Sequence, residues 1–121
     1  MQDLLRGDGD VLTWWGSKVE AASALARLAR EGALEGAKQD AAFSRMEALA
    51  AGWDEVLPSD PLREQAIRLL RVHPLRSADA LQLASAVVGS EHNPAAVPFV
   101  TLDHRLREAA AREGFQVLPP A

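Results

Sequence analysis

Three acidic residues of this sequence, Glu20, Asp79 and Asp103, stand where helices are expected to begin. Asp79 is the most unusual of them, because the helix that it starts is apolar almost from end to end. A carboxylate on a buried helix has to be paired, hydrogen-bonded or bound to a metal ion, since an isolated buried charge is strongly unfavourable. A helix N-terminus stabilises the ionised carboxylate, and Mg²⁺ or Mn²⁺ binds such oxygen ligands. If the three acids meet, they predict a metal site that activates water against a phosphodiester.

Each acid also has a structural explanation that involves no ligand. Ser17 and Glu20 have the spacing of a capping box, in which the two side chains bind the backbone at a helix start. Asp103 is suited to be the N-cap of the following helix, and Asp79 would lie in a first turn, where the helix dipole favours an anion. Both kinds of role are compatible, because a helix start keeps a carboxylate ionised. Spacing alone does not choose between them.

The elements that would position these acids alternate along the chain. Apolar runs predict strands at residues 11–14, 53–57, 98–101 and 115–118, and capped apolar stripes predict helices at 17–32, 34–51, 60–73, 77–88 and 104–113. Residues 4–5 suit the last turn of a helix, and residues 7–9 suit a turn. This alternation predicts one α/β domain over residues 1–121 with a mainly parallel sheet flanked by helices. Ligand sites of such sheets lie beyond the carboxyl ends of the strands, where Glu20, Asp79 and Asp103 can meet.

Helical spacing also predicts which side chains of these helices form the core. The set includes Leu25, Leu28, Met46, Leu49, Leu62, Ala66, Leu69 and Leu70. On the outer face, Glu64 and Arg68 are four residues apart and are expected to form an ion pair, with Asp60 as the N-cap of their helix.

Composition narrows the classes of function. A formal net charge of −4 gives no overall basic surface, so binding to nucleic acid would need a local basic patch. The absence of cysteine excludes disulfides, thiolate zinc sites and a cysteine nucleophile. No apolar run has the length of a membrane span and no secretory signal is visible, so we expect a cytoplasmic location without a membrane partner.

Three motifs carry a resemblance to a known family. Residues 75–84, LRSADALQLA, resemble the third acidic motif of the PIN-domain family, especially of VapC-type toxins. FVTLD, which ends at Asp103, resembles the fourth, and SKVE, which ends at Glu20, is similar to the second. The resemblance implies a three-layer PIN-like fold and a metal-dependent endoribonuclease, the toxin of a type II toxin–antitoxin system. It further implies that Glu20, Asp79 and Asp103 hold Mg²⁺ or Mn²⁺, with RNA as substrate, a cognate antitoxin as partner and a homodimer as the assembly.

The start of the chain departs from this family. Its members begin with a central strand that ends in an aspartate, whereas Asp3, Asp8 and Asp10 follow no predicted strand. We therefore expect the first central strand to be missing and the domain to be N-terminally truncated relative to the family. One alternative is a catalytically impaired truncated PIN fold that binds an antitoxin or its own copy. Another is a receiver-like domain that uses its acids for Mg²⁺ and phosphoryl transfer, although no lysine follows a late strand.

Some further side chains have the chemistry to contact RNA. Arg27, Arg76, Arg105 and Arg107 would suit a phosphate-binding rim, His104 could touch a phosphate, and Trp14 or Trp15 could stack on a base. The plainer expectation is solvated charges and one tryptophan in the core. His73 and His92 show no spacing typical of a metal site.

Overall fold

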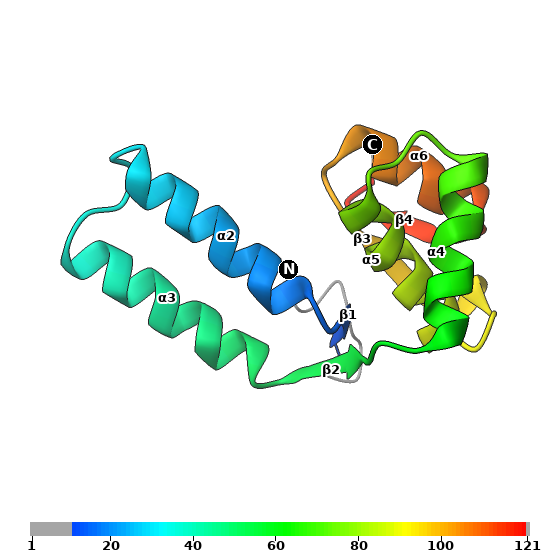
Figure 1. Ribbon diagram of the computed structural model, residues 1–121, viewed down its shortest axis with the longest axis horizontal. Coiled ribbons are helices and arrows are strands. Elements are labelled where there is room, and N and C mark those ends of the chain that lie inside the picture. Colours follow the sequence, from blue (N-terminus) through cyan, green and yellow to red (C-terminus); the bar gives the residue numbers. More distant parts are fainter. Residues whose placement is uncertain (1–10, 121) are drawn as a thin grey trace.

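The computed structural model describes residues 11–120 as a mixed α/β chain (Figure 1). The strands are β1 Val11–Trp14, β2 Trp53–Val56, β3 Pro98–Val100 and β4 Gln116–Leu118. The helices are α2 Ser17–Arg30, α3 Ala37–Ala50, α4 Asp60–Val72, α5 Ser77–Gly89 and α6 His104–Arg112, with a 3₁₀ turn, η1, at Pro94–Ala96. Each predicted strand and helix of this range is present within a few residues of its expected bounds. The expected helix end at residues 4–5 and turn at residues 7–9 lie outside the described residues.

The strands are parallel, as expected, but the described residues form two separate sheets. β1 pairs with β2 in the register Val11↔Trp53 to Trp14↔Val56. β3 pairs with β4, with Phe99 opposite Val117. In the part of the chain that the structure describes, β1 and β3 therefore each have one neighbouring strand, and each leaves its other edge without one.

Helix α5 forms the centre of the core. Ala80, Leu83 and Ala84 are fully buried, which explains the nearly continuous apolar sequence of this helix. Burying a leucine side chain completely contributes about 1.5–3 kcal/mol relative to leaving it in water. Although α5 is apolar, no helix within residues 11–120 is long and apolar enough to cross a membrane. The residues that cover it come from α4 and α6: Leu62, Ala66, Leu69, Leu106, Ala109 and Ala110.

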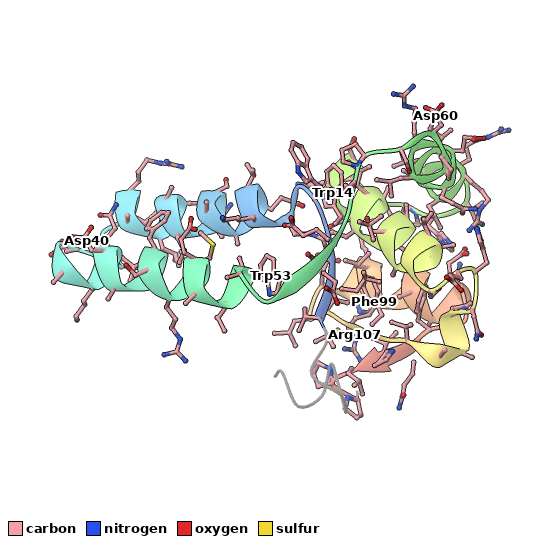
Figure 2. The ribbon with its side chains drawn as sticks, turned by 90° about the horizontal axis from the view of Figure 1, so that it is seen from below. Trp14, Asp40, Trp53, Asp60, Phe99 and Arg107 are labelled. Carbon is pink, nitrogen blue, oxygen red and sulfur yellow. The ribbon has the colours of Figure 1, made fainter. Side chains whose placement is uncertain are left out.

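The α2–α3 hairpin extends away from this core in both views of the molecule (Figures 1 and 2). Ala50 is the one buried residue that the two helices contain. Leu28 and Leu49, which were expected in the core, are 40% and 43% exposed, and Leu70 on α4 is 41% exposed. These three core predictions are wrong, because helical spacing identifies an apolar stripe but not whether another layer covers it.

The caps of the helices correct two local predictions. Ser59, not Asp60, is the N-cap of α4, and its Oγ accepts a hydrogen bond from the backbone N–H of Leu62 at 3.2 Å. Gly16 is the N-cap of α2 without a side-chain cap, so the predicted capping box of Ser17 and Glu20 is wrong. The helix begins one residue early, which leaves the Glu20 side chain available for a different contact.

A polar cluster joins the end of α4 to the end of α6. The Arg68 guanidinium donates to Glu113 Oε1 at 2.6 Å, and His73 Nε2 lies 2.7 Å from Glu113 Oε2. Arg68 thus pairs with Glu113 rather than with Glu64 as predicted, because tertiary packing brings a better partner than the exposed neighbour on its own helix. Burial raises the pKa of the Glu113 carboxyl, but the hydrogen bonds and charges of Arg68 and His73 outweigh this effect and hold that pKa below its ordinary value of 4.5. The cluster therefore stabilises the ionised form of Glu113.

Replacing Glu113 with glutamine should lower the free energy of unfolding at neutral pH by about 1–3 kcal/mol, because hydrogen bonds to charged groups contribute more than neutral ones. A carboxyl whose pKa is lowered by folding contributes stability above its unfolded pKa, and that contribution disappears as the pH falls through the folded pKa. The difference between wild type and Glu113→Gln should therefore shrink on acidification through this range. Urea unfolding followed by tryptophan fluorescence at several pH values measures it. Glu108→Gln, at an exposed site on α6, is the matched control; an equal loss in both variants would contradict the prediction.

Candidate functional site

Glu20 points from α2 toward the N-terminal half of α5. Both of its carboxylate oxygens lie 3.4 Å from the donor Nε2 of Gln82, which is 62 residues away from Glu20 in the sequence. Both side chains are half-buried. This contact, rather than a helix cap, fixes the position of Glu20.

Asp79 lies on the same face of α5 as Gln82. It is in the first turn of that helix, three residues before Gln82, and side chains with this spacing are neighbours on a helix surface. The Asp79 carboxylate is half-buried and forms no ion pair or side-chain hydrogen bond among residues 11–120. Glu20 and Asp79 are therefore brought to one surface of the molecule.

Asp103 is the N-cap of α6. Its Oδ1 accepts a hydrogen bond from the backbone N–H of Leu106 at 2.9 Å, so it caps α6 as predicted. Its own N–H donates to Thr101 Oγ1 at 3.1 Å, and Arg107 donates to the Thr101 carbonyl at 2.9 Å. The carboxylate is exposed and is held at the end of β3, on the second sheet.

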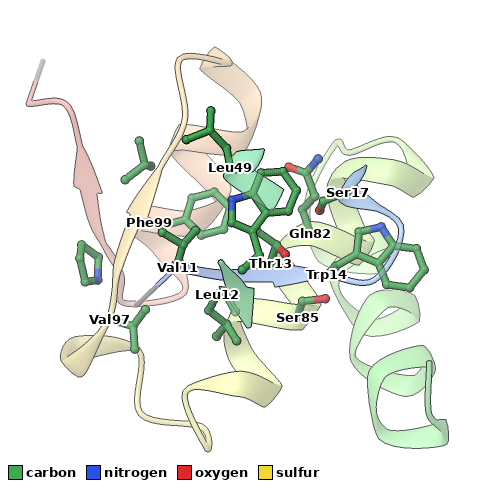
Figure 3. A pocket seen from close by; sticks show the side chains of 14 residues that line it. Val11, Leu12, Thr13, Trp14, Ser17, Leu49, Gln82, Ser85, Val97 and Phe99 are labelled. Atoms are coloured by element: carbon green, nitrogen blue, oxygen red, sulfur yellow. The ribbon is translucent and has the colours of Figure 1, made fainter. Parts of the chain in front are cut away.

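A cavity of about 400 Å³ lies between the two sheets (Figure 3). All residues of β1 and of β3 line it, α5 contributes Gln82, Ser85 and Ala86, and α3 and β2 contribute Leu49 and Trp53. Most of these side chains are apolar. The cavity separates the strand that leads to Glu20 from the strand that leads to Asp103.

Two of the three predicted acids lie on one surface where a metal ion could bind, and the third does not. Among the described residues, no group of three Asp, Glu or His side chains is close enough to hold an ion together. Mg²⁺ commonly keeps several waters and binds proteins through one or two carboxylates, so the surface that carries Glu20 and Asp79 has a suitable donor set. Asp103 does not join that pair as a third ligand; it follows β3 of the other sheet and caps α6.

The remaining candidates have mostly ordinary roles. Trp14 packs against the core, and Trp15 is 53% exposed with its ring edge-to-face to Trp14 at 6.2 Å. Arg27, Arg76, Arg105 and His104 are exposed, whereas Arg107 is held by the Thr101 carbonyl. Sequence reasoning missed Gln82, although its spacing from Asp79 was a usable signal. It also missed the pairing of His73, for which no local pattern exists.

Comparison with protein-family models, with curated proteins and with solved structures finds no match to this chain.

Two substitutions of Asp103 test whether the protein needs its hydrogen-bonding cap or also its negative charge. Asp103→Ala should destabilise the protein by about 0.5–2 kcal/mol, because the N–H of Leu106 loses its partner. Asp103→Asn should cost much less, since asparagine is an equally good N-cap. Thermal unfolding measures both. A loss with asparagine as large as that with alanine would show that the negative charge itself is needed for stability.

Proposed function

We propose that this chain is a PIN-like, metal-dependent endoribonuclease, the toxin component of a type II toxin–antitoxin system. The contact of Glu20 with Gln82 is the observation that carries this proposal, because it places Glu20 on the face of α5 that bears Asp79. It agrees with the resemblance of residues 75–84 to an acidic motif of that family. Glu20 and Asp79 are the proposed ligands of Mg²⁺ or Mn²⁺, and RNA is the proposed substrate. The resemblance adds Asp103 to this set, but among the described residues it does not form a group of three with them.

Each residue of the proposed site has a distinct task. Asp79 lies in the first turn of α5, and its carboxylate forms no ion pair or side-chain hydrogen bond with another of the residues 11–120. Gln82 orients the Glu20 carboxylate toward the same face. When bound, a divalent ion would activate a water molecule and stabilise charge on the phosphodiester. The exposed Arg76 precedes α5 and would contact phosphate groups of the RNA backbone, which position a nucleic acid without reading its sequence.

Asp79→Asn should weaken Mn²⁺ binding at least tenfold and abolish metal-dependent cleavage of RNA, because the amide replaces an anionic oxygen ligand with a neutral one. Asp40→Asn is the matched control, since Asp40 is also in the first turn of a helix but lies on the α2–α3 hairpin (Figure 2). Calorimetry with Mn²⁺ measures binding, and gel analysis of an RNA with and without EDTA measures cleavage. Equal Mn²⁺ affinity and equal cleavage in wild type and Asp79→Asn would contradict the assignment.

A second function, a protein-binding module without catalysis, is favoured by one observation. The α2–α3 hairpin contains one buried residue and exposes Val19 at 70% together with Leu28 and Leu49. A hairpin with so few buried residues leaves apolar side chains that a partner protein would cover. A chain that is inert toward RNA in every metal tested and that elutes as a dimer or binds an antitoxin would support this second function over the first.

A further inference from the structure

A second cavity, the α4 groove, lies between α4 and the first half of α5 and has a volume of about 280 Å³. Leu62 and Ala66 of α4 are buried in its wall, and Leu81 lines it from α5. Ile67 and Leu70 also line it, but they are 52% and 41% exposed. These two side chains therefore form an apolar ridge that borders the groove.

The ridge and the α4 groove lie side by side on one face of the molecule. A two-fold symmetric contact places the same surface of two copies against each other, so it needs a projection and a recess on that one surface. When the ridge of one copy enters the groove of the other, the reverse contact forms at the same time. Side-chain ridges that pack into grooves are the usual way in which helices meet. The shape of this surface therefore suits a second copy of the chain.

Charged residues at the two ends of α4 set the direction of such a contact. Asp60 is seven residues before Ile67 and Arg71 is four residues after it, so both lie on the side of the helix that carries Ile67. Both are exposed, and neither forms an ion pair within residues 11–120. When two copies of α4 cross in antiparallel directions, Asp60 of each copy faces Arg71 of the other. A parallel arrangement would instead bring like charges together.

Other occupants fit this surface less well. A small apolar ligand would fill the α4 groove but leave the ridge in contact with water. An RNA strand would gain little from electrostatic attraction, because the face that carries the ridge has two acids and two bases, whose charges cancel: Asp60, Arg63, Glu64 and Arg71. Opposite charges at the ends of one helix favour a partner with the same pattern in the reverse direction.

We propose that two copies of this chain associate through the α4 groove, with α4 of one copy antiparallel to α4 of the other. Ile67 and Leu70 form the apolar centre of the contact, and Asp60 and Arg71 form its charged rim, which is the usual anatomy of a protein interface. The self-association is independent of the proposed activity, because the acids of the proposed metal site do not line the groove. A chain that is inert toward RNA can still form this dimer.

Sedimentation equilibrium of the full chain should show a monomer and a dimer in exchange. Ile67→Glu places an unpaired charge in the centre of the contact twice, once from each copy, so it should weaken the dimer at least tenfold. Leu28→Glu is the matched control, because Leu28 is an exposed leucine on the α2–α3 hairpin, and it should leave the dimer unchanged. Circular dichroism checks the fold of both variants. A monomer at every concentration would overturn the proposal, as would a dimer that Ile67→Glu weakens no more than Leu28→Glu does.

Exchanging the charges at the ends of α4 tests the direction of the contact without changing its apolar centre. Asp60→Arg and Arg71→Asp each bring like charges together in the antiparallel arrangement, so each should weaken the dimer. The double variant restores opposite charges at both ends and should recover most of the wild-type affinity. Recovery of this kind is the non-additivity expected of residues in contact. A double variant whose loss of affinity equals the two single losses combined would overturn the antiparallel contact.

Discussion

The burial of α5 is the constraint on which the rest of this structure depends. Its residues from Ala80 to Val87 are nearly all apolar, so the helix has to be covered from several directions. α4 and α6 supply two of its covers, and β1 approaches so closely at Gly89 that a side chain there would meet Leu12. The one acid of α5, Asp79, and its one amide side chain, Gln82, both lie in the N-terminal half of the helix. The same packing that stabilises the domain therefore selects where an anionic site can form.

A second constraint is that strands must satisfy their backbone groups. In each of the two sheets, a strand forms backbone hydrogen bonds with its partner strand on one side. Among residues 11–120, the other edges of β1 and β3 have no neighbouring strand. This separation explains why the acids are only partly assembled. Glu20 follows β1 and reaches α5, whereas Asp103 follows β3 and is used as a helix cap. The division of the strands into two sheets therefore decides which of the acids come together.

Features set by neighbouring residues could be predicted from the sequence, and features set by tertiary contacts could not. The strand Val11–Trp14, the cap at Asp103 and the helix end at Gly114, whose φ is +100°, follow from local apolar runs and backbone preferences. The partner of Glu20 was missed because it lies 62 residues away. The pairing of Glu113 with His73 spans 40 residues, and no local sequence pattern predicts it. Parallel strand direction was predictable from alternation, but the division into two sheets was not, because it depends on which edges meet.

The cavity and the acids are linked by the strands that lead to them. β1 continues through a short turn into α2, which carries Glu20, and β3 leads directly to Asp103. An ion that bound both Glu20 and Asp103 would restrain β1 against β3, because each carboxylate follows one of these strands. The width of the cavity between the two sheets therefore limits how closely these two carboxylates can approach each other.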